Sequence, residues 1–255
     1  MLDDMLKEAK KKKLRILRGT DKKLDIIWVP FDIPQIDNMM GGGLPLGRMV
    51  LIVGNFGVGK TFFTQLCIAN FQKLGRTAAY VDTERRYDPT WFKNSGINTE
   101  ELSVAQPDSG EDALDICAFL IEQRVDLVVL DSIAALVPTA ELEGTMEDNT
   151  IASQARLLNK GLRKTTKLNI ASDDLTYQGT SFVAINQLRS GIGPFTTYAL
   201  PGGKGQQYFA SSLIRINRGS YIEEGKKRIG FNLKMFSEKN NLAPSLRECS
   251  IPFLF

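Results

Sequence analysis

Few patterns restrict the fold around them as strongly as residues 54–61 of this sequence do. They read Gly-Asn-Phe-Gly-Val-Gly-Lys-Thr and fit G-x-x-x-x-G-K-[ST], in which glycines let backbone N–H groups turn inward around a polyphosphate. The apolar run Met49–Val53 precedes the pattern and predicts a buried strand, and Phe62–Ala69 follows it and predicts a helix. The N-terminus of such a helix adds partial positive charge. This context favours a phosphate-binding loop over an incidental glycine-rich turn.

The loop supplies most of the candidate nucleotide contacts. We expect Lys60 to reach the β- and γ-phosphates and the Thr61 hydroxyl to ligate Mg²⁺. The nucleotide contacts predicted in this stretch are Gly54, Asn55, Phe56, Gly57, Val58, Gly59, Lys60, Thr61 and Phe62.

Carboxylates follow two further apolar runs that predict buried strands. Thr77–Val81 leads into Asp82-Thr83-Glu84, and Leu127–Leu130 leads into Asp131. Strands that alternate with helices predict a parallel sheet covered on both faces, with ligands at the carboxyl ends of the strands. We therefore expect Asp131 at the magnesium site.

Glu84 is the candidate general base, because hydrolysis needs a carboxylate that orients and deprotonates water. Asp82 is the rival, since strand alternation turns it to the same side. Glu84 is preferred because it lies further toward the phosphates. Trp91 suits stacking on adenine and packing within a helix about equally well.

Composition excludes several classes of site. The chain has no histidine, which rules out histidine-based triads, histidine general bases and histidine-ligated metals. Cys67, Cys117 and Cys249 lie in apolar stretches without metal-ligand spacing, so we expect reduced core thiols. No apolar run approaches the ~20 residues that span a bilayer, and no signal-peptide core is present, which predicts a cytoplasmic protein without a membrane partner.

Charge must be read locally. The formal net charge is +3, but residues 1–23 hold nine basic and four acidic residues, a net +5, which leaves −2 for the rest.

Apolar spacing from Leu2 to Ala9 predicts a short amphipathic helix, which is either a solvated end or an arm that docks elsewhere. Residues 189–205 interleave cations, aromatics and glycines, as single-stranded nucleic acid requires, and a flexible surface loop has the same composition.

The remaining elements are expected as follows. Further strands are predicted at Asp25–Val29, Leu102–Ala105, Ser181–Ile185, Leu213–Ile216 and Phe231–Met235. Helices are predicted to start at Tyr87–Trp91 and Asp108–Glu111 and to cover Thr150–Lys167, and loops are predicted at Glu141–Asn149, Asn169–Gly179 and Arg189–Gly205.

With these pieces in place, the chain resembles the RecA family of homologous-recombination ATPases, from about Arg15 to about Pro252. Besides the phosphate loop, an ordered series of stretches carries the resemblance: GGLPLGR (42–48), YVDTERRYDP (80–89), QPDSGEDALDIC (106–117), VVLDSIAAL (128–136), AELEG (140–144), INQLR (185–189) and YFAS (208–211).

The resemblance implies an α/β fold. Residues 34–255 are expected to form a RecA-like P-loop ATPase core with a mostly parallel central sheet flanked by helices. Residues 1–33 are expected to form an N-terminal oligomerisation helix and strand. The implied function is a DNA-dependent ATPase that uses ATP and Mg²⁺, forms a homo-oligomeric helical filament on single-stranded DNA and promotes pairing and strand exchange with double-stranded DNA. A hexameric motor or helicase and a nucleotide-binding recombination regulator are the alternatives.

The family pattern also implies residue roles. Glu84 matches the catalytic carboxylate, acting with Lys60, and Gln187 matches a glutamine that senses the γ-phosphate. Asp131 matches the magnesium-site aspartate, and Asp88 and Trp91 join the nucleotide contacts. Glu141–Ser153 and Leu188–Gly205 resemble two DNA-binding loops, with predicted contacts at Arg156, Arg189, Ser190, Gly191, Gly202, Gly203 and Lys204. Protomer contacts are implied for Ile16, Tyr208 and Lys239.

Some positions depart from the family pattern. Asn55, Phe56 and Val58 stand where bacterial relatives often carry small or hydroxyl residues, which backbone donors tolerate. Near Lys239, relatives carry a lysine pair that reaches ATP across the protomer interface, and here only Lys239 matches, which weakens the expectation of cross-protomer activation. Many relatives continue into a small C-terminal domain, so we expect a compact, viral-type member or a trimmed chain.

Overall fold

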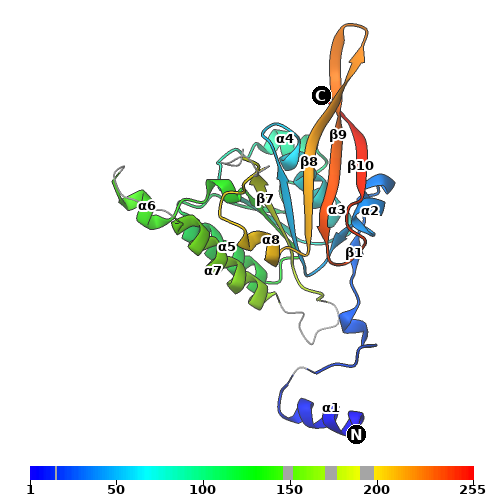
Figure 1. Ribbon diagram of the computed structural model, residues 1–255, viewed down its shortest axis with the longest axis vertical. Helices are drawn as coiled ribbons and strands as arrows, with labels where there is room; N and C mark the ends of the chain where they lie inside the picture. The colour runs from blue at the N-terminus through cyan, green and yellow to red at the C-terminus, as the bar shows by residue number, and fades with distance from the viewer. Residues whose placement is uncertain (15, 146–151, 170–176, 190–197) are drawn as a thin grey trace.

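A single sheet with helices on both faces organises the molecule (Figure 1). The computed structural model describes residues 1–14, 16–145, 152–169, 177–189 and 198–255. Within these residues, eight strands are ordered β10-β9-β8-β3-β7-β6-β4-β5. Neighbours from β8 to β5 are parallel, and β9 and β10 extend the β8 edge in antiparallel fashion. The predicted α/β fold with a mostly parallel central sheet is confirmed.

The element bounds are as follows. The helices are α1 (Leu2–Lys11), α2 (Pro34–Met40), α3 (Lys60–Lys73), α4 (Pro89–Asn94), α5 (Gly110–Glu122), α6 (Thr139–Glu143), α7 (Ser153–Leu168) and α8 (Gly205–Phe209), with 3-10 turns η1 (Lys22–Leu24) and η2 (Ile133–Ala135). The strands are β1 (Trp28–Val29), β2 (Leu44–Pro45), β3 (Met49–Gly54), β4 (Ala78–Asp82), β5 (Leu102–Ala105), β6 (Leu127–Asp131), β7 (Ser181–Gln187), β8 (Ser212–Glu224), β9 (Lys227–Asn240) and β10 (Glu248–Leu254).

The central strands are buried on both faces, as their continuous apolar runs require. In β3, Val50 and Ile52 point into the apolar cluster that includes side chains of α2, α3 and α4. Leu51 and Val53 point into the opposite cluster, which includes side chains of α5 and α7. Alternation along one strand therefore builds two cores and holds the sheet between them.

Strand register brings the predicted site residues to one edge of the sheet. In the parallel pair β4 and β6, Asp82 lies opposite Asp131. In the pair β3 and β7, Gly54 at the start of the loop lies opposite Gln187. The carboxyl ends of four strands thus meet where the phosphate loop begins, as expected for ligand sites in parallel sheets.

Three sequence expectations need correction. Asp25–Val29 is a strand only at Trp28–Val29, because its partner β2 is itself only two residues long. Glu141–Glu143 lies in α6 rather than a loop, and Met146–Asn149 lies outside the described residues. The segment 189–205 does have regular structure at its ends: Arg189 forms an antiparallel bridge with Ala199, and α8 begins at Gly205.

The helix α2, the strand β10 and most of the β8–β9 hairpin were not predicted from the sequence. Pro34 at the first position of α2 and Gly41 in the left-handed conformation after it are helix boundary signals that could have been read. The hairpin carries charged residues along its outer half, so no apolar alternation marks it. Pro252 sits in β10, where an edge strand tolerates a missing N–H.

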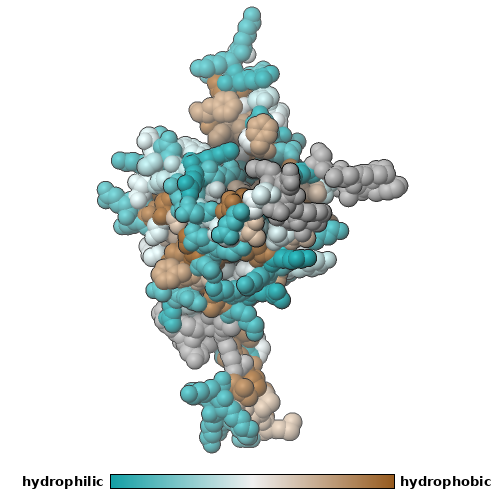
Figure 2. All heavy atoms as spheres, turned by 90° about the vertical axis from the view of Figure 1, so that its left-hand side faces the viewer, coloured by the Kyte–Doolittle hydropathy of each residue, from teal (hydrophilic) through white to brown (hydrophobic). Residues whose placement is uncertain are grey.

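The N-terminal helix α1 lies apart from the sheet, at the end of an arm below the body (Figure 1). Leu2 and Met5 are about half exposed, and apolar side chains are visible on this arm in Figure 2. The division into residues 1–33 and 34–255 stays a prediction.

Phe63 tests the core beneath the phosphate loop. It is fully buried in α3, 5.1 Å from the ring of Phe31. We expect Phe63→Ala to lower the free energy of unfolding by about 3–5 kcal/mol, because it leaves a cavity between helix and sheet. Chemical denaturation measures this. Phe119→Ala, at a residue 58% exposed on α5, is the control and should change stability by less than about 0.5 kcal/mol. Equal effects of the two substitutions would contradict this packing.

Candidate nucleotide-binding and catalytic site

The loop between β3 and α3 depends on glycines for its shape. Gly57 and Gly59 have φ angles of +65° and +95°, a region that favours glycine. A Cβ on Gly54 would lie 2.4 Å from the carbonyl oxygen of Ile216, so only glycine fits where β3 meets β8. The motif glycines are thus required by the backbone.

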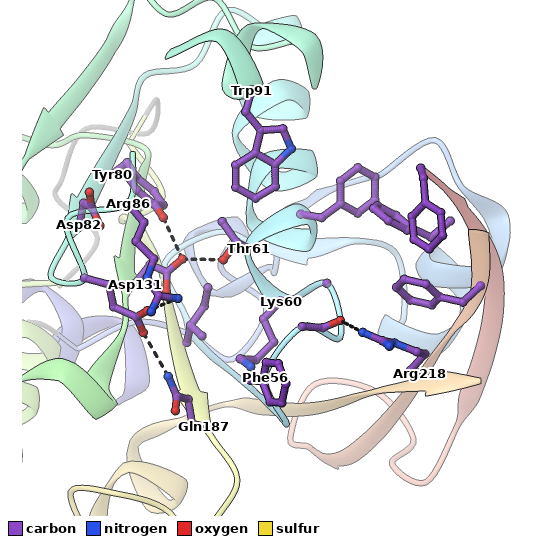
Figure 3. A pocket seen from close by; sticks show the side chains of 18 residues that line it. Phe56, Lys60, Thr61, Tyr80, Asp82, Arg86, Trp91, Asp131, Gln187 and Arg218 are labelled. Atoms are coloured by element: carbon purple, nitrogen blue, oxygen red, sulfur yellow. Dashed lines mark hydrogen bonds and ion pairs between the residues drawn. The ribbon is translucent and has the colours of Figure 1, made fainter. Parts of the chain in front are cut away.

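Two cations bind backbone carbonyl groups of this loop. The Lys60 ammonium donates to the carbonyl oxygens of Gly54 (3.0 Å) and Asn55 (2.6 Å). On the far side of the loop, Arg218 Nη2 donates to the carbonyl oxygen of Gly57 at 2.6 Å, as Figure 3 shows. The two cations therefore stabilise the course of the loop backbone.

Asp131 joins the loop helix to the sheet. Its Oδ2 accepts hydrogen bonds from Thr61 Oγ1 (2.9 Å) and Tyr80 Oη (2.8 Å), and both side chains converge on it in Figure 3. Burial raises the pKa of Asp131, opposed by these two hydrogen bonds, with Glu84 and Asp82 adding to the rise. Burial also lowers the pKa of Lys60, an effect opposed by Asp131 and Glu84. A buried carboxylate favours a bound cation, and a buried ammonium favours bound phosphates.

Glu84 is held by side chains from three other positions. Its Oε1 accepts from Ser132 Oγ (2.7 Å) and from Gln187 Nε2 (3.2 Å), and its Oε2 lies 3.0 Å from Arg86 Nη1. A carboxylate fixed beside a glutamine can orient and deprotonate a water molecule. The predicted pair Glu84 and Gln187 is therefore brought together.

Asp82, the rival base, has a different setting. It is 1% exposed, and its Oδ2 accepts from the backbone N–H of Tyr87 (2.9 Å) and from Gln106 Nε2 (3.0 Å). These bonds fix the turn after β4. The arrangement favours Glu84 over Asp82 as the group that faces a reacting water.

A cavity of about 480 Å³ contains these groups. One wall carries Lys60, Thr61, Glu84, Asp131 and Gln187, and Trp91 and Phe56 also line it. Part of the lining is aromatic: Phe253 packs on Phe62 (ring centroids 4.7 Å apart) and on Phe231 (5.0 Å). A polar end and an aromatic end suit a ligand with phosphates and a base.

Four predicted nucleotide contacts do not line this cavity with their side chains. Gly54 and Asn55 contribute carbonyl oxygens to Lys60. Val58 packs into the apolar core. Asp88 caps α4, accepting from the N–H groups of Thr90 (2.8 Å) and Trp91 (3.2 Å). A direct contact of Asp88 with nucleotide stays a prediction.

The residues present fit Mg²⁺ held largely by phosphates. No group of three or more His, Cys, Asp or Glu side chains suited to a metal occurs in the described part of the chain. Mg²⁺ typically takes one or two carboxylates together with substrate phosphates and water. Thr61 and Asp131, already 2.9 Å apart, would hold it beside the loop.

Among the described residues, the predicted DNA contacts Arg189, Gly202, Gly203 and Lys204 follow β7 in the chain, and Arg156 lies on α7. Residues 202–205 pack on α7: a Cβ on Gly202 would lie 2.5 Å from the Leu158 side chain, so this glycine is needed for packing. Arg156 on α7 is exposed, as are Arg189 and Lys204. Ser190 and Gly191 lie outside the described residues. DNA contact at these positions stays a prediction.

Two buried amides, missed in the sequence, connect the catalytic edge to this segment. Asn186 Nδ2 donates to the carbonyl oxygen of Pro201 (2.9 Å) and to Gln206 Oε1 (2.7 Å). Gln206 Nε2 donates to the carbonyl oxygens of Pro201 (2.6 Å) and Gly203 (2.8 Å). Asn186 immediately precedes Gln187. The end of β7 is thus hydrogen-bonded to the returning segment.

The three predicted protomer contacts have different environments. Ile16 is 44% exposed and Tyr208 is 81% exposed. The Lys239 ammonium is committed within its own chain, donating to the carbonyl oxygens of Gln207 (2.8 Å), Tyr208 (3.4 Å) and Ala210 (2.6 Å) at the end of α8. Burial lowers its pKa. Contact of these residues with a neighbouring protomer stays a prediction.

Other site residues were also missed. Tyr80 could have been found, because strand alternation from Asp82 places it on the same face of the sheet. Phe253 alternates with Ile251 and Cys249, which indicates a strand face. Arg86 and Arg218 lack such a pattern, because an isolated arginine has no local signature that distinguishes a site residue from a solvated one.

Asp131→Asn tests the burial of this carboxylate. We expect it to stabilise the protein without Mg²⁺ by roughly 1 kcal/mol, raising the melting temperature by about 2–4 °C, because a buried charge is removed. The pKa of Asp131 is higher in the folded state than the unfolded value of 3.8. The free energy of unfolding of the wild type therefore falls as the pH rises from the unfolded pKa through the folded pKa. The gain should therefore be larger at pH 8 than at pH 4.5.

Melting curves without Mg²⁺ measure the effect. Asp126→Asn is the control, because Asp126 accepts from Arg76 (2.9 Å) and from the N–H of Thr77 (3.0 Å), and its neutralisation should destabilise. Equal destabilisation by both substitutions would contradict the assignment of Asp131.

Comparison with known proteins identifies the family. The family model described as the RecA N-terminal domain matches residues 2–255. The chain is 38% identical over 247 residues to "Protein RecA" of Herpetosiphon aurantiacus, covering 94% of this chain and 66% of that protein. It is 38% identical to "Protein RecA" of Clavibacter michiganensis subsp. michiganensis, covering 93% of this chain and 65% of that protein, and 39% identical to "Protein RecA" of Tropheryma whipplei, covering 94% and 55%. The chain thus spans between about half and two thirds of the length of these relatives, and it belongs to the RecA N-terminal domain family.

Proposed function

We propose that this chain is an ATP hydrolase that assembles as a helical filament on single-stranded DNA. In this proposal it promotes homologous pairing and strand exchange with double-stranded DNA in recombination and repair. The observation that carries the proposal is the position of Glu84, held by Gln187 and Ser132 in the same cavity as the glycine-rich loop, Lys60 and Asp131. Membership of the RecA N-terminal domain family supports it.

Each group has a role in hydrolysis. The loop amides and Lys60 bind the phosphates, and Thr61 and Asp131 hold Mg²⁺, which neutralises phosphate charge. Glu84 orients the attacking water and accepts its proton, and Gln187 fixes Glu84. Trp91, Phe62 and Phe253 are placed to contact the adenine base of the nucleotide.

The amide pair Asn186 and Gln206 provides the coupling to DNA in this proposal. Gln187 contacts Glu84, and its neighbour Asn186 is bonded to the segment that carries Gly202, Gly203 and Lys204. A shift of β7 on hydrolysis would therefore change the DNA-binding segment, and bound DNA would in turn reposition Gln187.

We further propose a cytoplasmic location, with no membrane partner. The three cysteines are free thiols, as the reducing cytoplasm maintains them. None of the described helices is long and apolar enough to cross a membrane.

DNA-stimulated hydrolysis is the first test. We expect single-stranded DNA to raise the ATPase rate, and we expect the DNA affinity to fall steeply with salt, because phosphate contacts release counterions. An ATPase assay with and without DNA over a salt series measures both. Absence of hydrolysis under all conditions would favour a nucleotide-binding regulator.

Electron microscopy with a non-hydrolysable ATP analogue should show helical filaments, and closed rings would favour a hexameric motor.

Glu84→Gln is the second test. The amide keeps the size of the side chain but cannot accept a proton, so we expect turnover to fall by about 10²–10⁴-fold while ATP and DNA still bind. Single-turnover hydrolysis and nucleotide titration separate the two effects. Glu101→Gln, at an exposed residue just before β5, at the other end of the strands, is the control and should hydrolyse normally. Unchanged turnover in Glu84→Gln would remove Glu84 from the catalytic role.

A further inference from the structure

Among the residues that the structure describes, three cations line the nucleotide cavity, and their contacts differ. Lys60 and Arg218 both donate to carbonyl oxygens of the phosphate loop and so stabilise its shape. Arg218 is held in addition by stacking over Phe231, 5.0 Å from the ring centroid. Arg86 instead contacts a carboxylate, Oε2 of Glu84, at 3.0 Å. Figure 3 shows it on the Asp131 side, with Arg218 across the loop.

We propose that Arg86 is a catalytic residue that donates to the terminal phosphate during hydrolysis, in the chain that binds the nucleotide. The inference rests on the proposed function. If Glu84 positions the attacking water, a guanidinium in contact with Glu84 lies beside the phosphoryl group under attack. Negative charge on the phosphoryl oxygens and the leaving oxygen is what such a donor stabilises.

The ion pair with Glu84 still allows Arg86 to donate to the terminal phosphate. The side chain of Arg86 is 78% exposed, whereas that of Glu84 is 15% exposed. An ion pair with so exposed a partner contributes little to stability, so redirecting the guanidinium costs little. Glu84 stays fixed meanwhile, because Ser132 and Gln187 hold its other oxygen. One Nη group contacts Glu84, and the planar fork has further N–H donors for phosphoryl oxygens.

The proposed step balances without any other reactant. A bond forms between the water oxygen and the γ-phosphorus, and the bond from that phosphorus to the bridging oxygen of ADP breaks, with its electron pair leaving on ADP. The water proton passes to Glu84. Arg86 donates hydrogen bonds throughout and transfers no proton, because its guanidinium stays charged.

The neighbouring residue supplies a matched control. Arg85 has a φ of +54°, and its guanidinium forms an ion pair with Asp108 rather than with Glu84. The side chain of Arg85 is 59% exposed, and the residue is not among those that line the cavity. Arg85→Gln and Arg86→Gln therefore remove the same charge from adjacent exposed positions, and of these two only Arg86 lines the cavity.

The test compares these two variants with wild type in three measurements. These are single-turnover ATP hydrolysis, the affinity for Mg²⁺–ADP, and the affinity for Mg²⁺–ADP with aluminium fluoride, which mimics the transferred phosphoryl group. We expect Arg86→Gln to slow hydrolysis by about 10²-fold and to weaken the aluminium fluoride complex by a similar factor. ADP affinity should change less than about threefold. Arg85→Gln should match wild type in all three.

Each outcome decides. Hydrolysis in Arg86→Gln at the wild-type rate would overturn the assignment of Arg86 and leave the proposed function standing. A faster rate would overturn it as well, because it would indicate that Arg86 masks Glu84. An equal loss of ADP and aluminium fluoride affinity would reduce Arg86 to a ground-state binding residue. Lack of hydrolysis in wild type itself would overturn both the proposed function and this inference.

Discussion

The contact between Thr61 and Asp131 is the interaction on which the site depends. Thr61 belongs to the helix that follows the phosphate loop, and Asp131 ends a strand two places away in the sheet. Their hydrogen bond fixes where α3 begins relative to the carboxyl edge of the sheet. Tyr80 donates to the same oxygen from β4, which pairs with β6 on the side away from β7. The β3–β7 register sets the start of the loop opposite Gln187, and the Thr61–Asp131 bond adds the link from α3 to β6.

Residues with short-range or periodic signals were predictable from the sequence. The loop, β3, α3 and the strand before Asp131 follow from apolar runs and glycine spacing, and a parallel sheet then requires their ends to meet. The convergence of Lys60, Thr61, Glu84 and Asp131 on one cavity was therefore expected, and the structure places them there.

Contacts that depend on distant packing were not predictable. The hydrogen bonds from the Lys239 ammonium to the carbonyls at the end of α8 are one example, because nothing near residue 239 in the sequence indicates them. The contact of Lys239 with a neighbouring protomer stays a prediction. Arg218 reaches the loop from β8, which is distant from β3 in the sequence and pairs with it in the sheet. Asn186 and Gln206 read as ordinary polar residues until the fold buries them together. These side chains connect the nucleotide edge to the rest of the molecule.

A crystal structure of this chain with Mg²⁺ and a non-hydrolysable ATP analogue would test the central claim directly. The account predicts phosphates within the amide-lined loop, Mg²⁺ about 2.0–2.1 Å from Thr61 Oγ1, and Asp131 beside the metal. It also predicts the γ-phosphate between Lys60 and Glu84. Phosphates bound outside the loop, or a metal remote from both Thr61 and Asp131, would contradict it.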